Sequence, residues 1–328
     1  MTQVAVRTAV KQALAKAEQY LPETLPASII TERQLPDRYT ALKNIHFPGS
    51  FAKLAEAKKR FIFEELFLLQ CGLLYYRDRI KEVRQGIKHG VDGKLVTAVK
   101  NSLPFELTEA QQKAWQEISL DMQDNKPMHR LLQGDVGSGK TVVSALALAK
   151  TVENGYQGCI MVPTEILAQQ HFETLTEYLG KQGLRVELLT SSVKKAKRRE
   201  ILENLELGEI DVLVGTHALI QDDVVFARLA LVVTDEQHRF GVRQREKLYQ
   251  KGKEPHVLAM SATPIPRTLA LILYGDMDLS VIDERPANRL PIKNCAVNTD
   301  YRPNAYRFML KQIEEGRQVY ITVSYTHL

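Results

Sequence analysis

The chain has 328 residues, of which 44% are hydrophobic and 25% charged, and a formal net charge of +5. This length suits about two domains with their own cores, and the composition is that of an ordinary globular protein. The three cysteines, Cys71, Cys159 and Cys295, lie far apart without a CxxC pair, which argues against a zinc site or a disulfide framework. No apolar run reaches the roughly 18 residues of a membrane span and no signal-peptide pattern is present, so we expect a soluble cytoplasmic protein without a membrane partner.

The first 100 residues predict an α-helical region. Apolar residues recur at helical spacing over residues 4–20, four prolines then break the segment, and Ser50 is placed to cap a long helix that runs to about residue 85. This helix has a broad apolar stripe, so we expect it to brace a nucleotide-binding domain or a further domain. Basic side chains flank the stripe and favour a solvated face over a DNA contact: Lys58, Lys59, Arg60, Arg77, Arg79, Lys81 and Arg84.

Glycines and charges without periodicity over residues 88–100 indicate a domain boundary. We therefore divide the chain into residues 1–100, 101–290 and 291–328. In the middle part, Thr108 is placed to cap a helix, and short apolar runs then alternate with amphipathic helices. The runs lie at residues 130–133, 158–162, 185–189, 211–214, 229–234 and 256–260. This alternation predicts an α/β domain with a parallel sheet that is covered on both faces.

Residues 134–141 match the pattern of a phosphate-binding loop, and a short strand precedes them while a helix follows. Glycines let consecutive backbone N–H groups turn toward a polyphosphate at the start of that helix. Lys140 would place a charge on the phosphates, and the Thr141 hydroxyl would complete a Mg²⁺ shell. The sequence predicts a nucleotide site formed by Gly134, Asp135, Val136, Gly137, Ser138, Gly139, Lys140 and Thr141.

Asp235 and Glu236 directly follow the apolar run at residues 229–234. By itself, Asp-Glu-Gln-His is typical of a charged strand end. Downstream of a phosphate-binding loop, a carboxylate at the end of a strand is where Mg²⁺ coordination is expected. We therefore predict that Asp235 faces the metal and that Glu236 orients or deprotonates the attacking water.

Further segments resemble the motifs of superfamily 2 helicases and occur in the same order. Phe105, Leu107, Thr108 and Gln111 resemble the Q motif; residues 162–170, 214–218 and 261–264 resemble motifs Ia, Ib and III. Each segment alone fits an ordinary strand-end turn, but their joint order does not arise by chance. The resemblance implies a RecA-like P-loop NTPase domain that uses ATP and Mg²⁺.

Residues 133–141, 235–242 and 260–268 together resemble the RecG family of bacterial branched-DNA translocases, and the resemblance covers about residues 3–323. The transcription-repair coupling factor shares the run Pro-Ile-Pro-Arg but typically has a further Glu and Gln after Asp-Glu. Gln237 and His238 therefore favour RecG. The alternatives are another superfamily 2 DNA translocase or, from a different class, a nucleotide-dependent binding module.

The RecG resemblance implies an ATP-dependent helicase that remodels stalled forks and Holliday junctions in recombination and repair. It further implies a monomeric, nucleoid-associated protein that also meets single-stranded DNA-binding protein. Adenine contact is implied for Phe105 and Gln111, and catalysis for Lys140, Asp235, Glu236, Gln237 and His238. Coupling of the nucleotide state is implied for Ser261 and Thr263, and DNA contact for Thr164, Gln169, Thr216 and His217.

The chain departs from the RecG pattern at both ends. Nothing in it resembles the family's N-terminal wedge, and residues 291–323 resemble only the start of the second motor lobe, with a first strand at 316–321. The later motifs include an arginine that reaches the γ-phosphate, and such a group contributes a factor of about 10³–10⁵ in rate. We therefore expect an internal fragment that binds ATP far better than it hydrolyses it.

Overall fold

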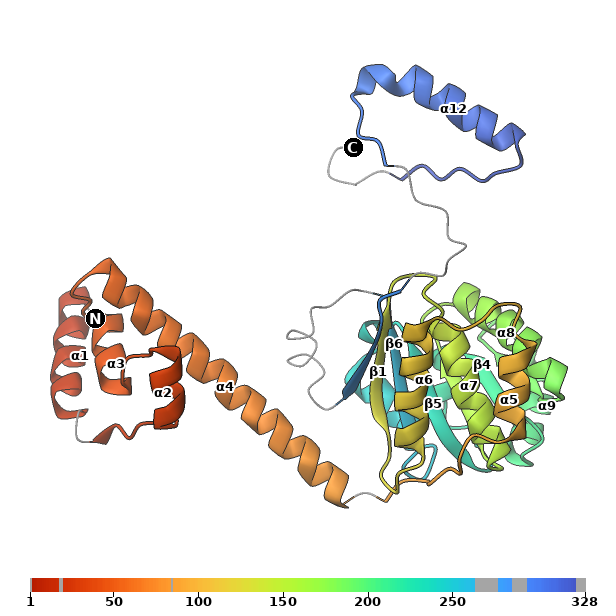
Figure 1. The fold of residues 1–328 in the computed structure, drawn as a ribbon, viewed down its shortest axis with the longest axis horizontal. Helices are drawn as coiled ribbons and strands as arrows, with labels where there is room; N and C mark the ends of the chain where they lie inside the picture. The colour runs from red at the N-terminus through yellow and green to blue at the C-terminus, as the bar shows by residue number, and fades with distance from the viewer. Residues whose placement is uncertain (1, 18–19, 84, 263–276, 285–293, 323–328) are drawn as a thin grey trace. The chain divides into compact units, whose positions relative to one another are not determined.

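A computed structural model describes residues 2–17, 20–83, 85–262, 277–284 and 294–322, and for residues 76–83 and 238 it describes the backbone only (Figure 1). The chain divides into two compact units, Met1–Pro286 and Ala287–Leu328. The predicted boundary at residue 100 falls inside the first unit and stays a prediction.

The predicted N-terminal helices are present, and prolines lie between them. They are α1 (Gln3–Ala17), α2 (Ala27–Arg33), α3 (Arg38–His46) and the long α4 (Phe51–Val83). The predicted cap of α4 is confirmed, because Ser50 Oγ accepts a hydrogen bond from the Lys53 amide at 3.2 Å. Asp37 caps α3 in the same way, accepting from the Thr40 amide at 2.8 Å. No helix in the described ranges is both long and apolar enough to cross a membrane.

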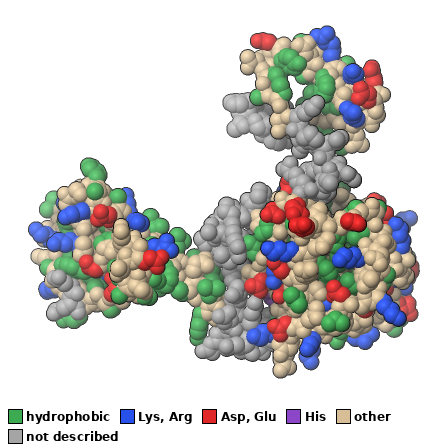
Figure 2. All heavy atoms as spheres, in the orientation of Figure 1, with side chains coloured by type: hydrophobic (Ala, Val, Ile, Leu, Met, Phe, Trp, Pro, Cys, Tyr) green, Lys and Arg blue, Asp and Glu red, His purple; other side chains and the backbone are tan. Residues whose placement is uncertain are grey.

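The apolar stripe of α4 is exposed along much of its length. Ile62, Leu66 and Leu69 keep 59%, 44% and 46% of their surface accessible. Figure 2 shows hydrophobic side chains at the surface over these helices. The expectation that α4 braces another domain therefore stays a prediction.

Arg60 does not belong to the exposed basic face that the sequence predicts. Its side chain is fully buried, with Nη1 donating to Glu64 at 2.8 Å and Nε to the Pro36 carbonyl at 3.1 Å. Nη2 donates to Glu23. These four residues, here called the Arg60 cluster, surround the guanidinium with acceptors, which is the condition for burying such a charge. Two of the three acceptors, Pro36 and Glu23, come from segments distant in sequence, so the helical pattern gives no indication of this burial.

Seven parallel strands form one sheet in the order β3-β4-β2-β5-β6-β1-β7. They are β1 (His129–Gly134), β2 (Gln157–Met161), β3 (Val186–Leu189), β4 (Val212–Gly215), β5 (Leu229–Asp235), β6 (His256–Ser261) and β7 (Asp278–Ile282). The predicted parallel sheet is confirmed. The sequence analysis missed β7, because this edge strand alternates polar and apolar residues and reads as a loop.

Helices cover both faces of the sheet, and strand residues alternate between two cores. Ile160 of β2 packs into the core under α5 (Lys94–Ser102), α6 (Glu109–Met122), α7 (Lys140–Glu153) and α8 (Glu165–Leu179). Its neighbours Cys159 and Met161 face the opposite core, under α9 (Lys195–Glu206) and α10 (Val242–Tyr249). Helix α5 corrects the expectation of an aperiodic boundary, since its Val96 and Val99 are buried in the first core.

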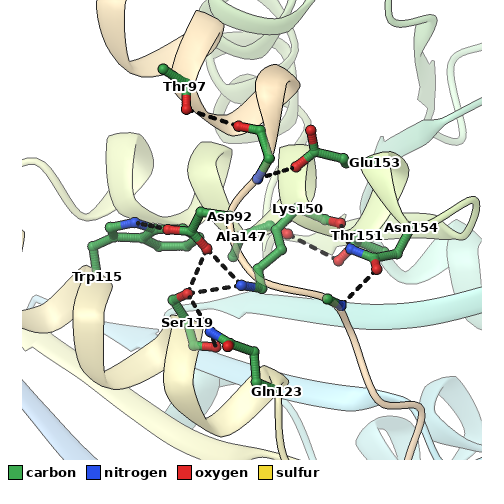
Figure 3. A network of polar contacts seen from close by, with 12 residues as sticks. Asp92, Thr97, Trp115, Ser119, Gln123, Ala147, Lys150, Thr151, Glu153 and Asn154 are labelled. Atoms are coloured by element: carbon green, nitrogen blue, oxygen red, sulfur yellow. Dashed lines mark hydrogen bonds and ion pairs between the residues drawn. The ribbon is translucent and has the colours of Figure 1, made fainter.

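A buried lysine fastens the segment before α5 to the α/β domain (Figure 3). Lys150 of α7 is fully buried, and its Nζ donates to Asp92 Oδ1 at 2.6 Å and to Ser119 Oγ at 2.8 Å. Trp115 Nε1 donates to the other Asp92 oxygen at 3.1 Å. Asp92, Trp115, Ser119 and Lys150, here called the Lys150 cluster, therefore join the segment before α5 to both α6 and α7.

Backbone contacts extend this attachment along residues 86–95. The amides of Gly93 and Leu95 donate to the Glu153 carboxylate at 2.9 and 2.7 Å. Next to them, Ile87 O lies 2.6 Å from His256 Nε2, and the rings of His89 and His256 contact each other with centroids 4.9 Å apart. These residues precede 101, the predicted start of the α/β domain, yet they pack as part of it.

The second unit contains η5 (Thr299–Tyr301) and α12 (Arg302–Glu314). The strand predicted at residues 316–321 is not formed, because residues 317–322 have no regular structure. A strand needs a neighbour for its backbone hydrogen bonds, and the described part of this unit contains no other strand. The prediction was wrong for that reason.

Candidate nucleotide and nucleic-acid site

The segments predicted to bind nucleotide meet at one edge of the sheet. β1 ends at Gly134, β5 at Asp235 and β6 at Ser261. The strands are parallel and in register, with Gln133 beside Ser261 and Asp235 beside Met260. The carboxyl edge of a parallel sheet is where such folds bind their ligands. The structure thus brings together segments that lie more than a hundred residues apart in sequence.

The loop of residues 134–141 has the backbone shape that a phosphate cradle needs. Gly137 and Gly139 take left-handed φ values of 78° and 91°, and α7 begins directly afterwards at Lys140. A Cβ at position 139 would lie 2.3 Å from Gln111 Nε2, so only glycine fits there. The Ser138 hydroxyl is buried without a partner among the described residues. This turn presents backbone N–H groups at a helix N-terminus, which is an anion-binding arrangement.

Lys140 lies folded across its own loop. Its Nζ donates to the carbonyls of Gly134 at 2.8 Å and Asp135 at 3.0 Å. Burial lowers the pKa of Lys140 below its usual range, while the carboxylates of Asp235, Glu236 and Asp135 oppose that shift. Lys140, the cation predicted for the phosphate loop, therefore lies close enough to Asp235 and Glu236, the acids predicted beside the metal, for their charges to interact.

Two contacts hold the Asp235 carboxylate at the end of β5. Oδ1 accepts from the Glu236 amide at 3.0 Å, and Oδ2 lies 2.9 Å from Nε2 of His171. Glu236 itself has φ 51° and ψ 50°, a left-handed conformation that costs free energy for a residue other than glycine. Such strain persists only where the surroundings enforce it, and it occurs often at functional sites.

Gln237, which follows Glu236, and Ser261, at the end of the neighbouring strand β6, are both buried. Gln237 is 2% exposed, and neither end of its amide has a hydrogen-bond partner in the part of the chain that the structure describes. The side chain of His238 and the whole of Thr263 lie outside the described residues.

The Q-motif residues link α6 to the phosphate loop. Thr108 and Gln111 form a reciprocal capping box at the start of α6, and Gln111 Nε2 donates to the Ser138 carbonyl at 2.7 Å. Phe105 is 43% exposed and lines a hollow of about 630 Å³ together with Leu107 and Gln112. Gln111 is buried behind this hollow, so adenine contact by Gln111 stays a prediction.

The residues predicted to contact DNA follow the carboxyl ends of β2 and β4. Thr164 is exposed and caps α8, accepting from the Leu167 amide at 3.3 Å, and a hollow of about 490 Å³ lined by Gln169 runs beside this helix. Gln169 is exposed and donates to Glu173 at 2.7 Å. His217 is exposed, whereas Thr216 is 1% exposed, so contact between the Thr216 side chain and DNA would require a rearrangement.

Sequence reasoning missed His171, which contacts the predicted metal-side acid. It lies within the helix after motif Ia, at helical spacing with the buried residues Ala168, Leu175 and Leu179. That spacing reads as an ordinary core stripe. The one available indication was a polar ring within an otherwise apolar stripe.

A family model described as DEAD/DEAH box helicase matches residues 108–272, which is half of the chain. The chain belongs to the DEAD/DEAH box helicase family. The matched range includes the phosphate loop, α8 and Asp235, so the family model covers the ends of β1, β5 and β6 that form the candidate site. It also confirms the predicted RecA-like class of the α/β domain.

Within this helicase family, the chain is similar to RecG proteins over nearly all of its length. It is 49% identical over 316 residues to the ATP-dependent DNA helicase RecG of Bacillus subtilis, covering 96% of this chain and 46% of the relative. It is 47% identical over 301 residues to RecG of Thermotoga maritima, covering 92% and 38%. The predicted resemblance to RecG is confirmed, and the chain spans less than half the length of these relatives.

A solved structure described as "Structure of RecG bound to three-way DNA junction" superposes with a TM-score of 0.78. It is 42% identical in sequence, and the match covers 96% of this chain and 42% of that one. The helicase MrfA bound to DNA and AMPPNP superposes with a TM-score of 0.51 at 18% identity, which shows a shared fold alone.

Proposed function

We propose that this chain is the ATP-binding part of a RecG-type DNA helicase that remodels branched DNA such as forks and Holliday junctions. The observation that carries the proposal is that Lys140 lies near Asp235 and Glu236 at the carboxyl edge of the sheet, where their charges interact. Strong similarity to RecG over the same residues supports it. The proposed domains are residues 1–100, 101–290 and 291–328, with residues 86–100 packed on the α/β domain.

The donor set at this edge fits a Mg²⁺-nucleotide. Backbone N–H groups of the loop and the Lys140 ammonium suit phosphate oxygens, while the Thr141 hydroxyl and the Asp235 carboxylate are oxygen ligands of the kind that Mg²⁺ prefers. When bound, Mg²⁺ neutralises charge that develops on the phosphate oxygens. Lys140 would exchange its bonds to the Gly134 and Asp135 carbonyls for bonds to phosphate.

The remaining carboxyl-edge residues have roles that follow from their positions. Glu236 would hold the attacking water and accept its proton. The amide of Gln237, which is costly to bury unpaired, would find a partner when the γ-phosphate is present, and His238, Ser261 and Thr263 would pass on that state. Phe105 offers a ring on which adenine can stack.

On the DNA side, the exposed residues Thr164, Gln169 and His217 would contact the nucleic acid, and Thr216 would support them from within. Branched DNA as the partner rests on the similarity to the RecG that was solved with a three-way junction. Contact with single-stranded DNA-binding protein, a monomeric state and association with the nucleoid rest on the RecG resemblance alone.

The proposal is tested by measuring the affinity of a fluorescent ATP analogue with Mg²⁺ for the chain and for Lys140→Ala. Loss of the ammonium removes charge-assisted hydrogen bonds to phosphate, so we expect the affinity to fall about 100-fold. Lys181→Ala, at an exposed lysine, is the matched control and should bind normally. Equal binding by the Lys140 variant would contradict the assignment of the loop.

A second measurement separates a DNA motor from a nucleotide-dependent binding module. The affinity for a model fork should fall steeply as salt rises, because each neutralised phosphate releases counterions. A flat dependence on salt would favour the binding module. DNA-stimulated ATP turnover by this chain alone should be negligible.

A further inference from the structure

His171 connects a helix on the DNA side with the acid on the metal side. Its Nε2 lies 2.9 Å from Asp235 Oδ2, although the two residues are 64 positions apart in sequence. The His171 side chain is 8% exposed and that of Asp235 is 14% exposed. The second ring nitrogen, Nδ1, is buried and has no hydrogen-bond partner among the described residues. Among the described residues, the contact with Asp235 is therefore the one polar interaction of this ring.

The packing of α8 fixes where the ring can lie. Ala168, Leu175 and Leu179 are fully buried in the core on the α7 side of the sheet, and His171 lies among them on the same stripe of the helix. A histidine with only a packing role in a core would form its hydrogen bond with any nearby backbone group. Here the partner is the Asp235 carboxylate, at the end of β5 on the carboxyl edge of the sheet.

The two oxygens of Asp235 are held by different parts of the fold. The Glu236 amide holds Oδ1 from within the same loop, whereas His171 holds Oδ2 from α8. Hydrogen bonds of this kind set the orientation of a metal-facing carboxylate. Removing the contact from α8 frees one side of the carboxylate and leaves the other side held.

The same helix begins on the DNA side. Thr164 caps α8, seven residues before His171, which is about two helical turns or roughly 10 Å along the axis. A helix of this length moves nearly as a rigid rod, so a displacement of its first turn also displaces the ring. DNA contact at the start of α8 and the orientation of Asp235 are thereby coupled.

We propose that His171 is a positioning residue that orients the Asp235 carboxylate and couples DNA contact at the start of α8 to Mg²⁺-nucleotide binding. The inference rests on the proposed function, because it takes Asp235 to face Mg²⁺. Coupling between two binding sites is reciprocal, so DNA changes the affinity for Mg²⁺-nucleotide by the same factor as Mg²⁺-nucleotide changes the affinity for DNA.

The test compares His171→Ala, His171→Gln and His171→Asn in the full 328-residue chain. The Gln side chain places its amide nitrogen near the position of Nε2, whereas the shorter Asn amide does not reach that position. Thr176→Ala, at an exposed position on the same helix, is the matched control. The measurements are Mg²⁺ titration of the chain loaded with a non-hydrolysable ATP analogue, analogue binding in EDTA, and both repeated with fork DNA.

We expect His171→Ala and His171→Asn to lower the Mg²⁺ affinity of the loaded chain about 10-fold, the size typical of a lost contact to a metal-facing group. Analogue binding in EDTA should stay within about twofold of the unmodified chain. The effect of fork DNA on Mg²⁺ affinity should disappear in the same two variants. His171→Gln should restore most of both properties.

Three results would overturn the inference. One is unchanged Mg²⁺ affinity and DNA coupling in His171→Ala. Another is an equal loss of analogue binding with and without Mg²⁺, which identifies a purely structural residue. If His171→Ala does not fold, the comparison of His171→Gln with His171→Asn takes its place. Equal Mg²⁺ affinity and equal DNA coupling in these two variants would then contradict the inference. Failure of the unmodified chain to bind Mg²⁺-nucleotide at all would instead overturn the proposed function, and the inference with it.

Discussion

Two fully buried cations, Arg60 and Lys150, hold different regions of the first unit together. Arg60 is surrounded by two carboxylates and a backbone carbonyl, whereas Lys150 has one carboxylate, one hydroxyl and the face of Trp115 at 6.0 Å. The Arg60 cluster joins segments within the N-terminal helices. The Lys150 cluster joins the segment before α5 to α6 and to the helix that begins at the phosphate loop.

The difference follows from how much apolar core each region has. Among the described residues before 84, the buried apolar side chains are Leu14, Leu25, Leu35, Ala41 and Ala57. Because this core is small, much of the stability of the N-terminal helices depends on the ion pairs around Arg60. Lys150 lies instead beside the large core under α5–α8, where it fixes the position of a segment more than the stability of the fold. The predictions below test this contrast.

The largest effect is expected for Arg60→Ala. It leaves the Glu64 carboxylate, which is 8% exposed, without its buried partner, and breaking such a pair costs about 3–5 kcal/mol. Hydrogen exchange should then accelerate throughout α2, α3 and α4 and remain slow in the sheet. Lys59→Ala, at the exposed neighbouring position, is the control and should exchange normally. Unchanged protection of α2–α4 in the Arg60 variant would refute a stabilising role for this cluster.

A smaller effect is expected for Lys150→Met, which keeps most of the side-chain volume. Asp92 is 35% exposed and keeps its bonds from Trp115 and Ser119, so the loss should be about 2–3 kcal/mol. Urea unfolding measures this loss, and hydrogen exchange should show it first at residues 86–93. Nucleotide affinity should stay within about twofold, because the substitution lies away from the phosphate loop. A large loss of affinity would mean that the cluster also shapes the loop.

The smallest effect expected of any one side chain is a loss of stability in mild acid, which comes from the buried pair His89 and His256 beside the Lys150 cluster. Burial lowers the pKa of His89 to about 4 and that of His256 to about 3. The unfolded chain takes up protons near pH 6.5 while the folded chain does not, so stability is full above that value and falls as the pH drops toward 4. Between pH 7 and 5 we expect a loss of about 1–2 kcal/mol per histidine.

Urea unfolding at several pH values measures this dependence. His89→Gln should flatten it, while His46→Gln, at an exposed histidine in α3, should leave it unchanged. The N-terminal helices should not share the acid sensitivity, because both rings belong to the α/β domain. Equal slopes for the two variants would show that the buried pair is not its source.

Local patterns in the sequence were sufficient for much of the fold. The strands from β1 to β6 were found because each contains a short apolar run and the runs alternate with amphipathic helices. β7 was missed because a polar edge strand has no such run. The strand at 316–321 was predicted from the RecG resemblance, and the described part of its unit contains no partner strand. Each error concerns an element whose state depends on its neighbours in space.

The candidate site also contains residues that local sequence patterns predict and residues whose partners lie far away in the sequence. The phosphate loop and Asp235 were found because their chemistry is carried by consecutive residues. Arg60 was misread because two of its three partners lie 24 and 37 positions away, and His171 was missed because its partner lies 64 positions away. A charged or aromatic polar residue within an apolar helical stripe is thus the feature that sequence reading should follow up.

The contact between Gly139 and Gln111 constrains how the nucleotide site can change. A methyl group at position 139 would lie 2.3 Å from the Gln111 amide nitrogen, so Gly139 can be replaced only if the Gln111 side chain moves. The Gln111 amide also bonds the loop at Ser138. Replacing Gln111 would therefore also remove a contact to the phosphate loop, so an engineered change of nucleotide specificity should begin at Phe105, on the exposed wall of the hollow.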